Sequence, residues 1–209
     1  TNLATKVSNS DEVHIGKKSI REDKNKISTV IVYNKPKGEI VSKKDPQGRK
    51  TIYDSLDHKY KHFLSVGRLD YASEGLLLLS DSVEIVDALM HSDLERVYKI
   101  KVNGVITKPV EQAMQNGLEI EDATGGAFKT TKIKSMSFAP FLAYDILTNS
   151  EKFSKIKVVI SEGKNRELRR FFAHFGLDVL DLKRLEYGGI SLNNLPTGKT
   201  RFLTKEEYK

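Results

Sequence analysis

One carboxylate in this chain stands where it could carry out chemistry. Asp70 lies on a predicted turn with Arg68, shortly before four consecutive leucines at 76–79. The leucine run, enclosed by Gly75 and Ser80, is too short for an amphipathic helix and indicates a strand buried on both faces. A carboxylate fixed beside such a rigid element is held still, as a catalytic group must be. The spacing is also typical of an ordinary charged surface turn, so it leaves both interpretations open.

A second segment, residues 165–176, combines an apolar helical pattern with three arginines. The apolar residues recur at i, i+3, i+4 and i+7, and they are Leu168, Phe171, Phe172 and Phe175. Asn165 is the predicted N-cap, and the glycine at 176 is the predicted stop. On this helix Arg166 and Arg170 fall opposite the apolar stripe, and Arg169 falls at its edge.

An arginine at the edge of a core-facing helix is seldom left without a partner. A carboxylate is its natural partner, and Asp70 is the best-placed candidate in the sequence. The alternative is that Arg169 lays its aliphatic stem over the core and reaches water. The sequence therefore predicts an Arg169–Asp70 ion pair.

The remaining pattern is rich in strands. Strands are predicted at 29–33, 96–102, 128–137, 142–147 and 156–160, and helices at 83–91 and 109–116. Few strands are separated by a helix long enough for a parallel crossover. We therefore expect an α+β fold with a central, mostly antiparallel mixed sheet flanked by helices and loops.

Composition favours a polyanionic partner. The chain has 35 Lys and Arg against 28 Asp and Glu, a net charge of +7. The surplus gathers in residues 34–62 and 163–185, which suggests a face for nucleic acid, although a lysine-rich solvated surface would look similar. The lack of cysteine and of any apolar run of bilayer length leads us to expect a cytoplasmic protein with no membrane contact.

Metal and cofactor signals are weak. His58 and His62 form a spaced pair with no third ligand nearby. No phosphate-binding glycine pattern of the Walker or dinucleotide type occurs. We expect no metal and no cofactor.

Several short motifs, taken in order, resemble those of the RsuA-like family of bacterial rRNA pseudouridine synthases. They lie at residues 34–38, 67–79, 96–99, 162–170 and 182–184. Residues 45–49 and 127–130 look most like its RluB-like branch, which acts on large-subunit rRNA. The resemblance implies the pseudouridine synthase fold over residues 26–209. Residues 1–25 resemble the back half of an RNA-binding module of the ribosomal-protein-S-four type, so we expect either a fragment or an unusual family member.

The resemblance also implies a reaction and its residues. Such an enzyme breaks the bond between uracil and ribose, rotates the base and rejoins it through carbon five, without a cofactor. Asp70 would be ionised and would either attack the ribose or remove a proton from it, with Arg169 as its partner. Tyr98 would stack on the base and help to remove the proton from carbon five. Leu182 would line the uracil pocket.

Substrate contacts follow from the same resemblance. A stacked uridine must be flipped out to react, and Arg68 would fill the vacated place. Lys35, Arg166 and Arg170 would contact phosphates, although the two arginines could equally form a solvated helix face. The expected partner is ribosomal RNA, as free 23S rRNA or a precursor particle, bound by a monomer. A non-catalytic rRNA-binding assembly factor with the same fold is the competing hypothesis.

Overall fold

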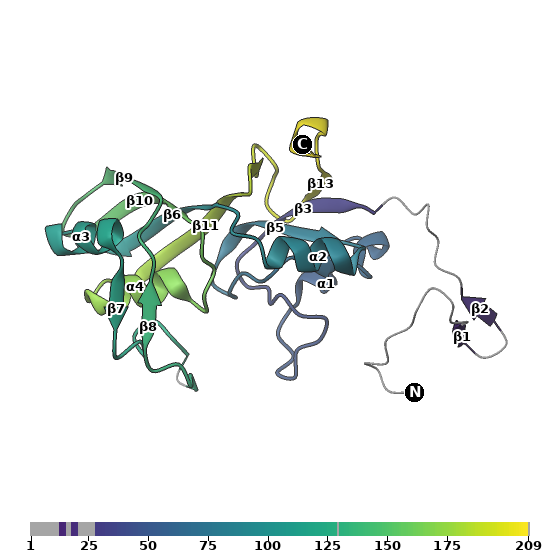
Figure 1. The fold of residues 1–209 in the computed structure, drawn as a ribbon, viewed down its shortest axis with the longest axis horizontal. Helices are drawn as coiled ribbons and strands as arrows, with labels where there is room; N and C mark the ends of the chain where they lie inside the picture. The colour runs from purple at the N-terminus through teal and green to yellow at the C-terminus, as the bar shows by residue number, and fades with distance from the viewer. Residues whose placement is uncertain (1–12, 16–17, 21–27, 129, 209) are drawn as a thin grey trace.

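The computed structural model describes residues 13–15, 18–20, 28–128 and 130–208 (Figure 1). Its centre is one large mixed sheet. In spatial order the main strands are β13 (Thr200–Phe202), β3 (Val30–Lys35), β5 (Glu74–Ser80), β11 (Val179–Tyr187), β6 (Arg96–Asn103), β10 (Phe153–Ile160) and β9 (Ala143–Thr148). Two short strands, β4 (Leu64–Ser65) and β12 (Ile190–Ser191), pair with β5 and β11.

The strand pairs of this sheet are antiparallel except β5 with β11, which run parallel. This confirms the predicted α+β class and the mostly antiparallel sheet. The parallel pair joins the two halves of the sheet, and the Asp70 turn leads directly into β5. The strand that carries the predicted site is therefore at the middle of the molecule (Figure 1).

The four leucines of β5 are fully buried, as predicted. Leu77 and Leu79 pack into one apolar core, while Leu76 and Leu78 pack into a second core on the other face. Since successive side chains of a strand point to opposite faces, the run separates the two cores. This double burial makes β5 a rigid support for the turn before it.

Each face has its own helices. The helices are α1 (Ile52–Ser55), α2 (Val83–Met90), α3 (Lys108–Asn116) and α4 (Glu167–His174), with 3-10 segments η1 (His58–Tyr60) and η2 (Lys205–Tyr208). Helices α3 and α4 contribute to the core of Leu77, and α2 contributes to the core of Leu76. In Figure 1, α3 and α4 lie beside β6, β9 and β10, and α2 lies beside β5. Within the described residues, no helix has the length and apolarity that a membrane span requires.

Two local predictions are wrong. Of the described residues in the strand expected at 128–137, those before Met136 form a loop, and only those in β8 (Met136–Phe138) pair, with β7 (Leu118–Ile120). This loop packs on α4, where a Cβ at Gly126 would collide with the backbone of Arg169. Helix α4 begins after Arg166, which has a left-handed φ of 52°, and not after Asn165.

Two short strands lie on either side of residue 16. Strands β1 (Val13–Ile15) and β2 (Lys18–Ile20) pair antiparallel. The rest of the expected RNA-binding module, residues 1–12, 16–17 and 21–25, lies outside the described residues.

Candidate active site

A buried lysine fixes the turn that carries Asp70. Lys35, at the end of β3, is fully buried, and its Nζ donates to the carbonyl oxygens of Pro36, Asp70 and Ser73 at 2.9, 3.2 and 2.9 Å. The backbone N–H of Ser73 donates to the Asp70 carbonyl at 3.0 Å and closes the turn. Burial lowers the pKa of Lys35 to about 8.

This geometry corrects the expectation for Lys35. An ammonium group has three N–H donors, and three carbonyl oxygens accept them here. Lys35 is therefore not available to a phosphate in this structure. It positions the backbone of Asp70 instead.

Close contact between β5 and β11 requires a glycine beside this turn. Gly75 has a φ of 105°, and a Cβ there would lie far inside the van der Waals radius of the Arg184 backbone. Gly75 pairs with Arg184 at the parallel junction. The junction therefore brings β11 next to the Asp70 turn.

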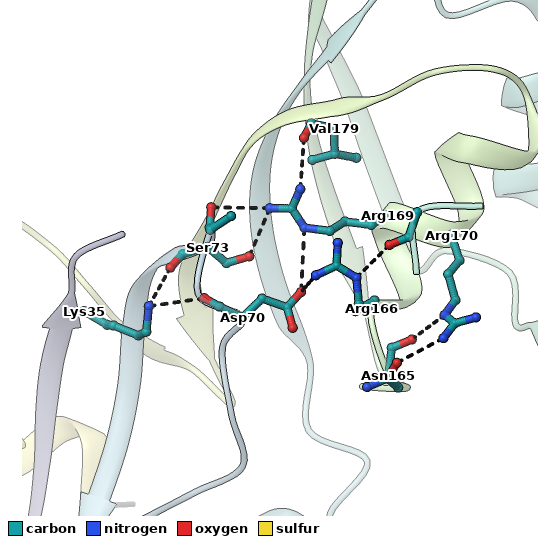
Figure 2. A network of polar contacts seen from close by, with 10 residues as sticks. Lys35, Asp70, Ser73, Asn165, Arg166, Arg169, Arg170 and Val179 are labelled. Atoms are coloured by element: carbon teal, nitrogen blue, oxygen red, sulfur yellow. Dashed lines mark hydrogen bonds and ion pairs between the residues drawn. The ribbon is translucent and has the colours of Figure 1, made fainter. Parts of the chain in front are cut away.

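Two arginines converge on one oxygen of Asp70 (Figure 2). Arg166 Nη1 lies 3.1 Å from Asp70 Oδ2, and Arg169 Nε lies 3.6 Å from the same oxygen. This confirms the predicted Arg169–Asp70 pair, and the sequence missed the closer pair with Arg166. Both guanidinium groups are largely buried, with side chains 14% and 10% exposed, so the attraction is weakly screened by solvent.

Arg169 is also tied to its surroundings. Its Nη1 donates to the Val179 carbonyl at 2.9 Å, and its Nη2 lies 3.3 Å from both the Ala72 carbonyl and Ser73 Oγ. Burial, followed by the charge of Arg166, lowers the pKa of Arg169. Arg169 thus connects α4, β11 and the Asp70 turn at one point.

Arg166 is held in place by the loop between β7 and β8. Its Nε donates to the Gly126 carbonyl at 2.6 Å, and its guanidinium lies 4.4 Å from the centre of the Phe128 ring. The left-handed backbone of Arg166 aims the side chain at Asp70 instead of along the helix. Such a conformation is strained for a residue with a Cβ and persists because these contacts fix it.

Arg170 does not lie on a solvated face. It is 1% exposed, and its guanidinium donates to backbone oxygens of Ala123 and Asn165 and to the side chain of Thr131. The interpretation as a solvated helix face is wrong because the 121–135 loop covers that side of α4. These bonds anchor the loop and leave Arg170 out of reach of a phosphate.

The remaining predicted residues meet Asp70 in one cavity of about 210 Å³. Tyr98 from β6 and Leu182 from β11 are buried in its wall, and Arg68 is exposed at its edge. The cavity is lined by Asp70, Tyr98, Leu182, Arg68, Arg166 and Arg169 among others, whereas Lys35 and Arg170 are outside its lining. An apolar and aromatic wall next to a carboxylate suits a flat heterocycle, and the surrounding cations suit an attached polyanion.

Sequence reasoning missed two further arginines of this cavity. Arg184 donates from Nε to the Leu76 carbonyl at 2.7 Å, and its buried Nη2 has no partner among the described residues. Arg96 lies 3.1 Å from the Tyr187 hydroxyl, and it also bonds the Ser161 carbonyl. Both residues fall inside the short sequence motifs at 96–99 and 182–184, and this position was the only sign in the sequence that they belong to the site. Their burial depends on strand pairing that the sequence does not display.

Glu167 is the buried acid of the cavity wall. It is 6% exposed, and its carboxylate accepts the backbone N–H of Lys164 at 3.0 Å. Burial raises the pKa of Glu167 to about 7, and the neighbouring Glu162 carboxylate adds to that rise. Glu167 therefore holds the turn that presents Arg166.

Comparison with known proteins agrees with this site. A family model described as RNA pseudouridylate synthase matches residues 29–174. An uncharacterized RNA pseudouridine synthase of Helicobacter pylori (strain ATCC 700392 / 26695) is 58% identical over 206 residues, covering 99% of this chain and 79% of that protein. The ribosomal large subunit pseudouridine synthase B of Bacillus subtilis (strain 168) is 34% identical over 212 residues, covering 100% of this chain and 80% of that protein.

The fold agrees as well. A crystal structure of pseudouridylate synthase matches with a TM-score of 0.70 at 25% identity, covering 97% of this chain and 81% of that chain. The resemblance to the RsuA-like enzymes and their RluB-like branch is thereby confirmed. The chain is an isomerase that belongs to the RNA pseudouridine synthase family.

Proposed function

We propose that this protein converts one specific uridine of large-subunit 23S ribosomal RNA to pseudouridine. The observation that carries the proposal is the Asp70 carboxylate, held by Arg166 and Arg169 in the same cavity as Tyr98 and Leu182. The large-subunit target is supported by the printed name of the Bacillus subtilis relative. The partner is free 23S rRNA or a precursor particle, and the enzyme acts as a cytoplasmic monomer.

The chemistry assigned to this site is an isomerisation. The target uridine leaves its stack and enters the cavity, and Arg68 at the edge occupies the vacated place. Ionised Asp70 attacks the ribose or removes a proton from it, and the bond from ribose carbon one to N1 of uracil breaks. The base rotates against Leu182 and rejoins through carbon five.

The role of Tyr98 follows from the protons that the base must lose and gain. Carbon five must lose its proton after the new bond forms, and N1 gains one, so product and substrate have the same composition. The Tyr98 ring stacks on the base while its hydroxyl assists removal of the carbon-five proton. Of the three cations expected to contact phosphates, Arg166 alone lines the cavity, so it is the remaining candidate for such a contact.

Residues 1–25 fit the same proposal as the back half of an RNA-binding module. Such a module would add phosphate contacts without touching Asp70, Tyr98 or Arg169. Its role is therefore affinity for rRNA and not the chemical step.

The proposal is tested by mapping pseudouridines in rRNA from cells with and without this protein. We expect one 23S position to lose its modification, to regain it with the wild-type protein and not to regain it with Asp70→Asn. Restoration by Asp70→Asn, or an unchanged map, would contradict the proposal. An unchanged map with an assembly defect would instead indicate a non-catalytic rRNA-binding factor.

A further inference from the structure

The sheet carries lysines in rows that cross adjacent strands. On β6, Lys99 lies directly opposite Lys157 of β10 and Lys183 of β11, and Lys101 lies opposite Lys155 of β10. Residues directly opposite each other in antiparallel strands point to the same face of the sheet. These five residues are called the lysine face.

The lysine face is on the reverse side of the sheet from the cavity. The alternate residues of β6, Tyr98, Ile100 and Val102, point into the core that α3 and α4 share. Tyr98 also lines the cavity. Both helices of this half of the sheet therefore pack on the Tyr98 side. On the other side Lys99 and Lys157 are exposed, and the other three lysines are partly exposed.

The lysine–lysine neighbours of this face do not stabilise the fold. Like charges placed directly opposite in a sheet are destabilising, whereas opposite charges there stabilise it. Among the described residues, none of the five lysines forms an ion pair within 4.0 Å. Three acids flank the rows: Asp145 lies opposite Lys157, Glu74 of β5 lies opposite Lys183, and Asp181 lies opposite Lys101. Asp181 is already paired with Lys37 at 2.6 Å, so the five lysines still outnumber the acids beside them.

An aromatic ring lies within the same face. Phe153 stands two positions before Lys155 on β10, and its ring centre is 4.4 Å from Lys101 Nζ and 5.6 Å from Lys155 Nζ. The ring holds the ammonium groups of two lysines together on this face.

We propose that the lysine face is a second RNA-binding surface, which contacts the phosphates of an RNA helix other than the one that supplies the uridine. That the partner is RNA rests on the proposed function. That this face binds a polyanion is argued from the lysine rows alone. Contacts with phosphates supply affinity and orientation without reading sequence. A large folded rRNA offers neighbouring helices that a short substrate hairpin lacks.

The test uses the exposed opposite pair in the full chain. The variant Lys99→Gln with Lys157→Gln removes two charges, and the control Lys108→Gln with Lys199→Gln removes two exposed charges elsewhere. Affinity for a fluorescent RNA duplex without unpaired uridine is measured between about 50 and 200 mM salt. We expect the variant to bind about tenfold more weakly, with a salt slope shallower by about 2, while the control stays close to wild type.

Two further readouts, the melting temperature and the single-turnover rate, separate this proposal from its alternatives. Because the variant relieves repulsion, its melting temperature at low salt should equal or exceed that of wild type, and a lower value would contradict the proposal. Its single-turnover rate on a saturating hairpin substrate should be unchanged, so a slower rate would assign the face to the active site. If neither the wild-type protein nor its variants make pseudouridine, the proposed function is wrong. The duplex-binding measurement still tests the lysine face in that case.

Equal duplex binding by variant and control would overturn the proposal. Weaker binding of the variant to polyglutamate, with unchanged duplex binding, would also overturn it and would assign the face to an acidic protein.

Discussion

The two sides of strand β6 hold cations in opposite ways. On the Tyr98 side, Arg166 just before α4 and Arg169 and Arg170 within it are largely buried, and each donates to oxygen atoms of the protein. On the Lys99 side, the five lysines form no ion pair within 4.0 Å with the described residues, and Lys99 and Lys157 are exposed. Buried cations define geometry and tolerate little change, whereas exposed cations act through their number and are screened by salt.

The comparison is tested most strongly at Arg170. Arg170→Ala removes donors from the buried Ala123 oxygen and the partly buried Asn165 oxygen and leaves a cavity against α4, so unfolding should become easier by about 4 kcal/mol. Lys157→Ala on the other side should change stability by less than about 0.5 kcal/mol. Urea denaturation measures both, and similar losses for the two variants would contradict the distinction.

Arg169 should affect stability and rate together. Arg169→Ala leaves Asp70 with one arginine and should destabilise the fold by about 3 kcal/mol, near the lower bound for a buried pair because Asp70 remains 27% exposed. The rate of pseudouridine formation should fall as well, because the Asp70 carboxylate is then no longer held in a fixed orientation. Arg169→Lys should recover part of the stability. A stable Arg169→Ala protein with normal turnover would contradict this role.

A substitution at Tyr98 distinguishes base stacking from proton transfer. Tyr98→Phe keeps the ring in the cavity wall and removes the hydroxyl, so RNA affinity should survive while the single-turnover rate falls about a hundredfold. An unaltered rate would exclude the hydroxyl from proton removal at carbon five.

The smallest expected effect concerns pH. The pKa of Glu167 is raised by burial to about 7, so the folded state binds its proton more tightly than the unfolded chain does. Its stabilising contribution is complete below about pH 4.5 and is lost as pH rises through about 7. Glu167→Gln should therefore gain stability relative to wild type by about 2 kcal/mol over that range, while Glu121→Gln, at an exposed position, should not. A difference independent of pH would show that Glu167 is ionised throughout.

Much of the fold followed from local pattern. The leucine run of β5 indicated a doubly buried strand, and the strand predicted at 96–102 is β6. The Arg169–Asp70 pair followed from the chemistry of an arginine at the edge of a core. These predictions succeeded because each depended on residues close in sequence or on one strong charge requirement.

The errors came from contacts between distant segments. The burial of Arg170 depends on a loop some 40 residues earlier in the chain, with separations of 47 and 39 residues to Ala123 and Thr131. Lys35 looked like a surface cation because the turn that accepts its bonds lies 35 to 38 residues away. The lysine rows could not be predicted either, since they depend on the register of β6 with β10 and β11.

Asp70 is the reacting carboxylate of the proposed mechanism, and one substitution tests that role directly. Asp70→Asn keeps the shape of the side chain but can neither attack the ribose nor accept a proton. The measurement is pseudouridine formation by the purified variant under single-turnover conditions with saturating RNA, next to its RNA affinity. We predict no product above background and nearly unchanged binding. Appreciable turnover by the variant would contradict the assignment of the active site.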